Sequence, residues 1–302
     1  MDGILVINKP LGWTSHDVVG RIRGLTLQKR VGHAGTLDPM ATGVLLVCLG
    51  RATRVSEYLM ASDKLYRAVM RLGVETDTYD ADGQVVATRP VNVSETDLRG
   101  ALTDCVGVIE QLPPMYSALK LQGKPLYKLA RKGIEVERKP RRVTIHSITL
   151  RAWESPDPCN GGEGLVTLDV RCAPGTYIRS LAHDIGAALG CGAHLTALTR
   201  LASGSFTIED AVKLKDLTGL TNLSGLLRPI DAALQDLPAI TLDADNARRV
   251  LMGQTIAPNG AETPAGSLCR AHDTEGALLA IMAYDTLAQL WRPKKVLSSL
   301  DT

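Results

Sequence analysis

The sequence has few aromatic residues, no long hydrophobic run and no export signal. Aromatic side chains make up 4% of its 302 residues, with Phe206 as the single phenylalanine, so the core must be mainly aliphatic. The longest uncharged run near the N-terminus, residues 39–50, is far shorter than the roughly 20 residues that a membrane-spanning helix needs. Residues 1–11 lack the basic lead and apolar block of a secretory signal. These absences argue against a membrane protein and a secreted protein.

The common metal, redox and nucleotide motifs are also missing. The six cysteines include no Cys-x-x-Cys pair, and the six histidines form no His-x-x-x-His or His-Glu pair. There is no phosphate-binding P-loop, no dinucleotide-binding glycine motif, no serine-hydrolase elbow and no deaminase zinc signature. Scattered cysteines without an export signal are typical of reduced cytoplasmic thiols. We therefore expect a cytoplasmic protein whose chemistry, if any, is performed by ordinary side chains.

The composition and the texture of the chain predict an α+β fold in two domains. Hydrophobic residues make up 45% and charged residues 22%, which is ordinary for a globular protein. The expected strands outnumber the expected helices and do not alternate regularly with them, which disfavours a doubly wound sheet. After Leu237 the chain changes to short strands separated by Gly, Pro and Asn turns. We therefore place a boundary near residue 237, with a small, mainly β module in residues 238–302.

Local signals predict the elements of the larger domain. Thr14 or Ser15 with Asp17, and Ser94 with Asp97, are typical of helix starts. Apolar or β-branched runs predict strands. The resulting predictions are strands at 3–8, 44–49, 64–72, 142–153 and 165–172, helices at 15–25, 95–105, 125–132 and 176–189, and an ordered loop at 31–43.

The net charge is only +2, but one segment of the chain is strongly basic. Residues 120–142 contain nine Lys or Arg against Glu135 and Glu137, a balance of +7. Such a segment is either a solvated surface or an electrostatic footprint for phosphate groups. The segment by itself leaves both interpretations open.

The most unusual segment is residues 32–43, which is dense in Gly, Thr and Pro. Pro39 directs Asp38 toward an extended conformation, so a stiffened backbone presents the carboxylate. An aspartate on such a loop suits a nucleophile or a general base. An Asx-type turn explains the same Asp-Pro pair, and the residues alone leave both possibilities open.

Arg179 is a second indication of a polar site. If Thr176 caps the helix that follows, Arg179 lies in the first turn, where a cation opposes the helix dipole by about 0.3–1 kcal/mol. An anionic partner such as Asp38 would compensate this charge, whereas a solvent-facing arginine would lose little. Tyr66 and Tyr177 are the nearest aromatic candidates for stacking on a flat base, although tyrosines in β-rich segments usually pack.

Six segments together resemble the bacterial TruB family of tRNA pseudouridine synthases, and they occur in the family's order over about residues 3–204. The segments are Gly3–Pro10, Gly32–Gly43, Asp63–Tyr66, Thr76–Gly83, Pro114–Lys120 and Gly175–Arg179. The resemblance implies a mixed, mainly antiparallel sheet with flanking helices in residues 1–237. It also implies an RNA-clamping insertion at about 120–142 and a PUA-like RNA-binding module in 238–302.

The same resemblance implies an activity and catalytic residues. The activity is isomerisation of uridine to pseudouridine at position 55 in the T loop of tRNA, by base flipping and without cofactor or metal. Asp38 matches the essential aspartate, and Arg179 matches the arginine that pairs with it. Tyr66 matches the tyrosine that stacks on the target base and helps to move its proton. Asp38 either attacks C1′ or takes a proton from C2′.

Other residues match substrate-binding positions of the family. They are His33 beside the displaced base, Tyr177 and Leu198 in the pocket, Lys9 and Pro10 as supports of the pocket, and Lys120, Lys124, Arg141 and Arg142 in the basic insertion. The implied partner is the T stem-loop of tRNA, with no membrane, no obligate protein partner and a monomeric chain. Two alternatives remain open, namely a non-catalytic tRNA-binding or folding module and an RNA N-glycosidase.

Overall fold

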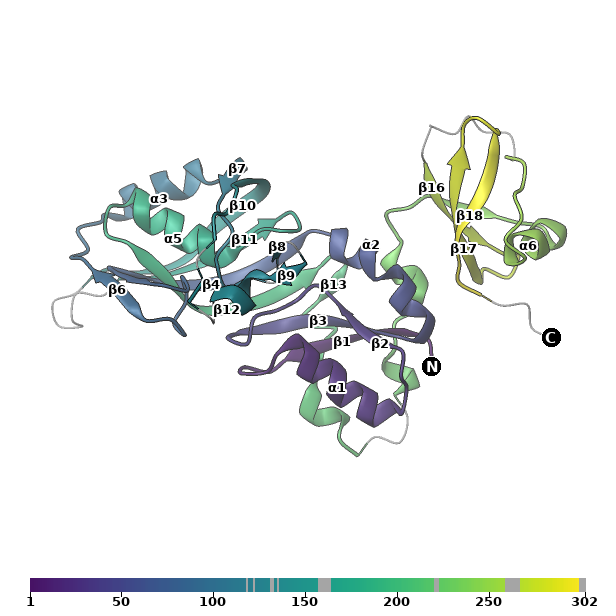
Figure 1. Ribbon diagram of the computed structural model, residues 1–302, viewed down its shortest axis with the longest axis horizontal. Coiled ribbons are helices and arrows are strands. Elements are labelled where there is room, and N and C mark those ends of the chain that lie inside the picture. The colour runs from purple at the N-terminus through teal and green to yellow at the C-terminus, as the bar shows by residue number, and fades with distance from the viewer. Residues whose placement is uncertain are drawn as a thin grey trace.

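The structure is a computed structural model that describes residues 1–117, 119–121, 123–130, 133–134, 136–156, 164–219, 223–258 and 267–298. Its main sheet is built from β1 (Gly3–Lys9), β2 (Val31–Ala34), β3 (Ala41–Leu49), β4 (Lys64–Leu72), β7 (Gly107–Gln111), β10 (Arg141–Glu154), β11 (Gly164–Cys172), β12 (Ala193–Ser203), β13 (Phe206–Thr207) and β14 (Val212–Lys213). The strand order is β14-β1-β3-β12-β4-β11-β10-β7, with β2 beside β3 and β13 beside β12 (Figure 1). Only the β1–β14 and β12–β3 pairs of this sheet are parallel. The predicted mixed, mainly antiparallel α+β fold is therefore confirmed.

Helices and short hairpins flank this sheet. The helices are α1 (Ser15–Thr26), α2 (Ser56–Ala61), α3 (Glu95–Asp104), α4 (Leu126–Ala130) and α5 (Ile178–Ala188), with 3-10 turns η1 (Gly50–Val55), η3 (Leu214–Leu217), η4 (Ser224–Leu226) and η5 (Ile230–Ala233). The hairpins pair β5 (Val74–Thr76) with β6 (Val85–Thr88) and β8 (Lys120–Leu121) with β9 (Lys124–Pro125). Figure 1 shows the β8–β9 hairpin near the middle of the molecule, between α1 and the part of the sheet around β4.

Both predicted helix starts are confirmed, and each carries a capping box. Thr14 is the N-cap of α1, because its side chain accepts from the Asp17 N–H while the Asp17 carboxylate accepts from the Thr14 N–H. Ser94 and Asp97 make the same reciprocal pair at the start of α3. Such side chains satisfy N–H groups that the first turn of a helix leaves without partners. The predicted helix at 125–132 corresponds to α4, and its last two residues lie outside the described part of the chain.

Two local predictions were wrong. Residues 31–43 are not all loop, since Val31–Ala34 forms β2 and pairs with residues 46–49 of β3, which itself begins at Ala41. Cross-strand pairing thus decides the structure of a Gly-rich segment whose local signals favour a loop. Thr176 does not cap α5: its hydroxyl donates to the Ala173 carbonyl, and Tyr177 is the N-cap.

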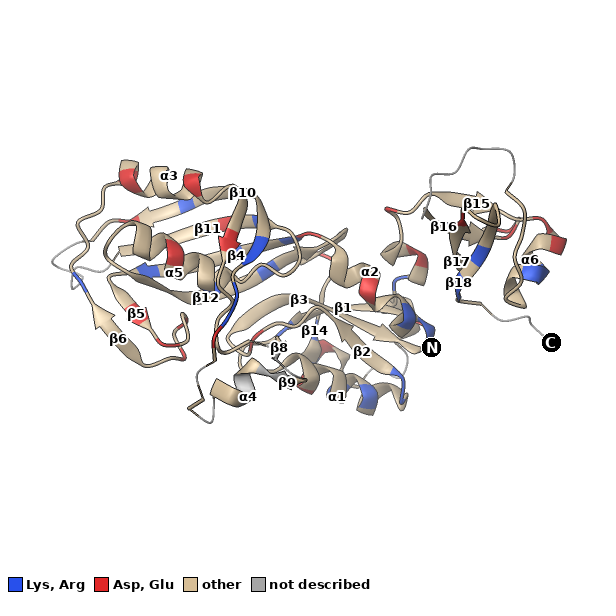
Figure 2. Cartoon of the chain, turned by 45° about the horizontal axis from the view of Figure 1, so that its top comes forward, with Lys and Arg blue, Asp and Glu red and all other residues tan. Residues whose placement is uncertain are grey.

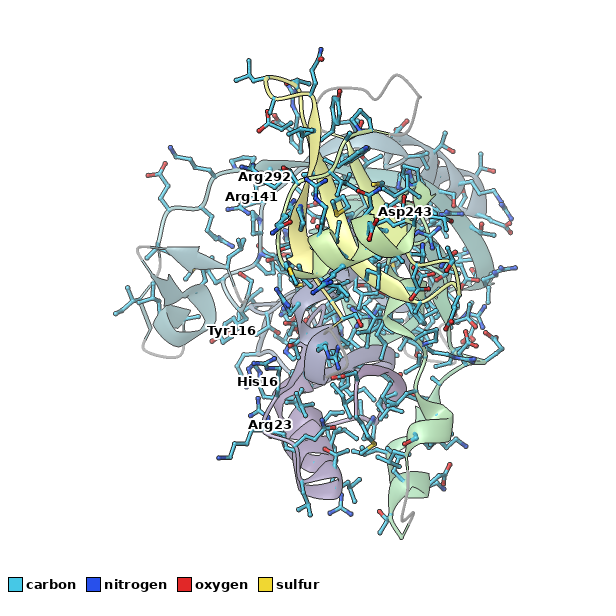
Figure 3. All side chains as sticks on the ribbon, turned by 90° about the vertical axis from the view of Figure 1, so that its right-hand side faces the viewer. His16, Arg23, Tyr116, Arg141, Asp243 and Arg292 are labelled. Atoms are coloured by element: carbon cyan, nitrogen blue, oxygen red, sulfur yellow. The ribbon has the colours of Figure 1, made fainter. Side chains whose placement is uncertain are left out.

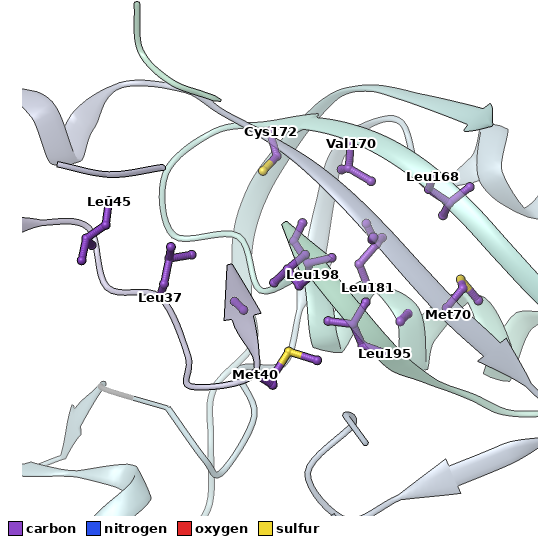
Figure 4. Packing of buried hydrophobic residues seen from close by; sticks show 14 of the residues in the cluster. Leu37, Met40, Leu45, Met70, Leu168, Val170, Cys172, Leu181, Leu195 and Leu198 are labelled. Atoms are coloured by element: carbon purple, nitrogen blue, oxygen red, sulfur yellow. The ribbon is translucent and has the colours of Figure 1, made fainter. Parts of the chain in front are cut away.

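The core lies on both faces of the sheet, which explains the unbroken apolar runs. On β1, Leu5 and Ile7 belong to the cluster that α1, α3 and α5 cover, whereas Ile4 and Val6 belong to a second cluster on the other face with Phe206. A strand buried on both faces reads as a continuous hydrophobic stretch rather than an alternating one. Figure 4 shows the first cluster where Leu37, Met40, Leu195 and Leu198 come together.

A second, four-stranded sheet follows residue 237. It contains β15 (Ala239–Thr241), β16 (Leu268–His272), β17 (Leu278–Asp285) and β18 (Leu290–Val296), in that order, with α6 (Ala244–Leu251) packed on it. It has its own hydrophobic cluster, which includes Trp291. Arg51 and Arg54 of η1 donate to the carbonyls of Leu297 and Val296, so polar contacts link η1 to the end of β18 and the residue after it. The domain boundary near residue 237 stays a prediction.

No helix in the described residues is long and apolar enough to span a membrane.

Candidate active site

Asp38 lies on the short connection between β2 and β3, and neighbouring side chains fix this connection. The Ser15 hydroxyl donates to the Leu37 carbonyl at 3.1 Å and accepts from the Leu37 N–H at 2.9 Å. From the other side, the fully buried Lys9 ammonium donates to the Pro39 carbonyl at 3.3 Å and to the Trp13 carbonyl at 2.6 Å. Hydrogen bonds on both flanks hold Asp38 in one place, as a catalytic group requires.

Burial lowers the pKa of Lys9 to about 8, while the negative charges of Asp38 and Asp17 oppose this fall. With this pKa, Lys9 is still mostly protonated at neutral pH, and it donates hydrogen bonds to backbone carbonyls. The structure thus places Lys9 beside the Asp38 connection, where it holds the backbone.

Arg179 reaches Asp38 from the first turn of α5. Its guanidinium is 2.9 Å from Asp38 Oδ2 and 3.0 Å from Asp80 Oδ2. It also donates to the carbonyls of Tyr116 at 2.7 Å and Thr78 at 3.3 Å. Arg179 is 4% exposed, so these four acceptors replace water around the cation. Two carboxylates therefore supply the negative charge that a cation at this end of a helix needs.

Asp80 is a member of the site that the sequence analysis did not single out. It lies in the acidic turn at residues 77–83, and its side chain is 5% exposed. It accepts from the Thr78 hydroxyl at 2.5 Å and the Asp82 N–H at 3.1 Å. Clustered acidic residues normally face solvent, so charge alone gave no sign of this burial. The only sequence signal for Asp80 was that its turn belongs to one of the six segments that resemble the TruB family.

Burial raises the pKa of the Asp38 carboxyl, Arg179 opposes this rise, and Asp80 adds to it. The Asp38 side chain is enclosed by protein atoms on most sides but keeps 38% of its surface open. A carboxylate in such a position is poorly solvated yet oriented by a guanidinium, which favours attack on an electrophile or removal of a proton.

A pocket of about 300 Å³ opens above this ion pair, and we call it the Asp38 pocket. Besides Asp38 and Arg179, it is lined by Tyr66, Tyr177, Leu198 and Arg200. A mainly apolar pocket with a few convergent polar groups is typical of a small-molecule or nucleobase site. The structure therefore brings together all three candidate catalytic residues and two of the candidate binding residues.

Both pocket tyrosines are desolvated. Burial raises the pKa of the Tyr66 phenol, and the Arg200 guanidinium opposes this rise. Burial also raises the pKa of Tyr177, with Arg141 among the opposing charges. Tyr177 is further fixed through its backbone, since its N–H donates to the Gln111 side chain at 2.8 Å. Each ring thus has a defined position from which it can contact a flat base.

The other candidates whose side chains are described lie outside the Asp38 pocket. Lys9 and Pro10 line a separate cavity of about 620 Å³, which is larger but holds none of the three catalytic candidates. His33 lines a third cavity of about 340 Å³ with Arg23 and Lys29. Arg141 and Arg142 are exposed at the start of β10, and the side chains of Lys120 and Lys124 lie outside the described part of the structure.

We expect His33 to make the stability of the fold depend on pH. Burial lowers its pKa to about 4, with His16 and Arg200 adding to the effect. Because the unfolded value is about 6.5, folding favours the neutral ring, and this stability is lost as pH falls from 6.5 through 4. We expect H33N to remove about 1–2 kcal/mol of that loss, after allowance for partial exposure. Urea unfolding at pH 7.5 and 4.5 measures it.

His183, which stacks on Tyr79 and forms no ion pair among the described residues, provides the control for this experiment. H183N should retain the wild-type difference in unfolding free energy between the two pH values. If H33N also retains the full difference, His33 is not the buried group that titrates.

Lys64 and Arg200 are further pocket residues that the sequence analysis missed. Lys64 is 6% exposed and Arg200 is 1% exposed. Arg200 lies two positions after Leu198 on the same strand, so the pattern of the strand could have indicated it. Among the described residues, no group of His, Cys, Asp and Glu is arranged to hold a metal ion.

Two family patterns match adjoining parts of the chain. The N-terminal domain of TruB family pseudouridylate synthases matches residues 23–178. The C-terminal domain of tRNA pseudouridylate synthase B matches residues 179–235. The first match contains Asp38, Tyr66 and Asp80, and the second begins at Arg179. The two patterns therefore meet at the ion pair of the site.

Curated relatives match nearly the whole chain. The tRNA pseudouridine synthase B of Aromatoleum aromaticum is 46% identical, over 100% of this chain and 94% of its own. That of Ralstonia nicotianae is 46% identical, over 93% of this chain and 90% of its own. That of Syntrophotalea carbinolica is 49% identical, over 84% of this chain and 81% of its own.

Two solved structures share the fold over the full length. A Cbf5–Nop10–Gar1 complex matches with a TM-score of 0.75 and 27% identity, over 98% of this chain and 85% of that chain. An H/ACA ribonucleoprotein bound to a substrate RNA containing 2′-deoxyuridine matches with a TM-score of 0.74 and 26% identity, over 99% of this chain and 86% of that chain.

Proposed function

Because this chain belongs to the TruB family of pseudouridylate synthases, we propose that it acts on uridine 55 in the T loop of tRNA. Its activity is the isomerisation of uridine to pseudouridine in tRNA, and the resemblance seen in the sequence is confirmed. The observation that carries the proposal is the Asp38 carboxylate, bonded to the buried Arg179 guanidinium in the Asp38 pocket beside Tyr66. The T-loop position is the part that goes beyond the family.

The reaction requires the C1′–N1 bond to break, the base to turn, and C5 to attach to C1′ before C5 loses its proton. Product and substrate are isomers, so the side chains need only bind, orient and move protons. We assign Asp38 to the sugar, as a nucleophile at C1′ or a base at C2′, and Arg179 to holding it ionised and aimed. We assign Tyr66 to stacking on the base and to accepting the C5 proton.

The target uridine must leave its stack to reach the Asp38 pocket, at a cost of a few kcal/mol. Contacts to the RNA backbone offset such a cost. In Figure 3, Arg292, Arg141, Tyr116, His16 and Arg23 follow one side of the molecule. Figure 2 shows basic residues on the segment that leads into β10 and on α1. We infer that this side binds the tRNA backbone, with the module after residue 237 as part of the surface.

The remaining expectations belong to the same proposal. Residues 120–142 act as the clamp over the T stem-loop, and residues 238–302 act as an RNA-binding module. His33, Tyr177, Leu198, Lys9 and Pro10 support or contact the flipped nucleotide from the positions described above. The cytoplasmic location, the monomeric state and independence from a protein partner stay predictions.

The test is chemical mapping of pseudouridine in an unmodified tRNA transcript. We expect the wild-type chain to form pseudouridine at position 55 and nowhere else, and to leave a U55C transcript unmodified. An abasic site with free uracil would identify an N-glycosidase, and tRNA binding without any change would identify a non-catalytic module. Either result would overturn the proposal, as would pseudouridine at another position.

A further inference from the structure

Arg200 is a buried cation in the wall of the Asp38 pocket. Its Nε donates to the Val44 carbonyl at 2.6 Å, and its Nη2 donates to the Gly35 carbonyl at 3.0 Å. Across the described residues, no carboxylate forms an ion pair with it, in contrast to Arg179 with its two. Carbonyl oxygens satisfy N–H donors but leave the net charge without a counter-charge, and burying such a charge is costly. A positive charge in this position therefore suggests that the site uses it.

The register of the sheet directs this charge at Tyr66. Arg200 of β12 and Tyr66 of β4 are direct partners across the antiparallel ladder, so their side chains leave the same face. Both side chains line the Asp38 pocket. Burial raises the pKa of Tyr66, and the positive charge of Arg200 is the strongest opposing influence. Cys172 and Asp38 act in the same direction as burial. Arg200 is thus the group that favours the phenolate form.

We propose that Arg200 is a positioning residue for proton transfer, which fixes the Tyr66 phenol and stabilises its phenolate form while the base is detached. This inference rests on the proposed role of Tyr66. When C1′–N1 breaks, N1 leaves with the bonding electron pair and takes the phenol proton, so the phenolate remains beside Arg200. After C5 has bonded to C1′, the phenolate takes the C5 proton and the phenol is restored. The cycle neither gains nor loses a proton, as an isomerisation requires.

The geometry suits this sequence of steps. The base turns so that C5 comes to the place that N1 left at C1′, and one phenol can therefore serve both atoms. A guanidinium is always charged and holds a fixed planar fork, so it stabilises a phenolate without taking part in the proton transfer. The carbonyls of Gly35 and Val44 prevent the fork from turning away. Those same bonds also support the Asp38 connection, so the test must separate the two effects.

The experiment compares R200Q with wild type in single-turnover reactions at saturating protein. The tRNAs carry uridine, [5-²H]uridine or 5-fluorouridine at the target position. We expect R200Q to slow the uridine reaction by about 10- to 100-fold without raising the C5 deuterium isotope effect, because the breaking of C1′–N1, which forms the phenolate, becomes limiting. Fluorine withdraws electrons and makes the base a better leaving group that needs the phenol proton less, so with 5-fluorouridine we expect a smaller loss in the rate at which the nucleotide is consumed.

Three comparisons make the result decisive. R67Q is the matched control, because Arg67 is the next residue on β4 and pairs with Asp169, with its side chain 47% exposed; it should behave as wild type. R200K keeps the charge and should lose less rate than R200Q, and it replaces R200Q if that variant does not fold. An equal loss with uridine and 5-fluorouridine, or a raised isotope effect, overturns the inference and leaves the proposed function intact. Full activity of Y66F overturns both the Tyr66 role and this inference.

Discussion

D38N is expected to abolish pseudouridine formation while leaving tRNA binding nearly unchanged. Asparagine has almost the same shape, and its carbonyl oxygen can still accept from the Arg179 guanidinium that lies 2.9 Å from Asp38 Oδ2. It lacks the charged oxygen that attacks C1′ or takes the C2′ proton. Loss of such a group typically costs at least about 10⁴-fold in rate. Release of tritium from [5-³H]uridine tRNA measures the chemical step, and filter binding measures the affinity.

The control for this variant is D216N, which changes an exposed aspartate of η3 that takes no part in the Asp38 pocket. D216N should keep the wild-type rate and affinity. A D38N rate above about one hundredth of wild type would assign the chemistry to another group. A loss of tRNA affinity as large as the loss of rate would place Asp38 in binding instead.

The expected acid limb of the pH profile follows from the same residue. The reaction needs the ionised carboxylate in either role, and burial raises the pKa of Asp38 above its ordinary value. Activity should therefore fall with decreasing pH earlier than it would with an exposed aspartate. The Arg179 charge limits this rise, so the ion pair keeps the carboxylate active over a wider range of pH.

Sequence alone predicted the parts of the fold that local signals determine. The capping pairs at Thr14 and Ser94 came directly from side-chain chemistry that acts within four residues. The prediction of a strand at 64–72 was correct because the mixture of apolar and polar residues in this segment matches a strand that is only partly buried. The loop predicted at residues 31–34 was wrong because these residues form a strand only through pairing with β3. The Gly-rich sequence carries no local signal for this pairing.

The site divides in the same way. Asp38 and Arg179 were found because each is unusual in its own segment, one before a proline and the other at a helix start. Asp80 and Arg200 were missed because their importance comes from burial against segments far away in the chain. Asp80 meets Arg179 across 99 residues, and Arg200 meets Val44 across 156. Contacts between residues so far apart in the chain cannot be predicted from composition or from the spacing of residues.

R179M is expected to destabilise the fold more than any other substitution at the site. It leaves the Asp80 carboxylate, 5% exposed, without its cation, and also removes the partner of Asp38. Removing one partner from a buried ion pair typically costs about 3–5 kcal/mol, because the remaining charge stays buried without compensation. Methionine fills a similar volume, so the loss reports charge rather than a cavity. Urea unfolding followed by circular dichroism measures the change in unfolding free energy.

The double variant R179M/D80N separates charge from packing. With the Asp80 charge also gone, the remaining carboxamide can still accept from the Asp82 N–H, and part of the lost stability should return. A double variant less stable than R179M would show that Asp80 stabilises the turn by other means. If stability returns but pseudouridine formation does not, the charges of Arg179 and Asp80 serve the reaction and not only the fold. Neutral side chains can fill the space as well, but only the guanidinium between two carboxylates keeps Asp38 ionised and aimed at the sugar.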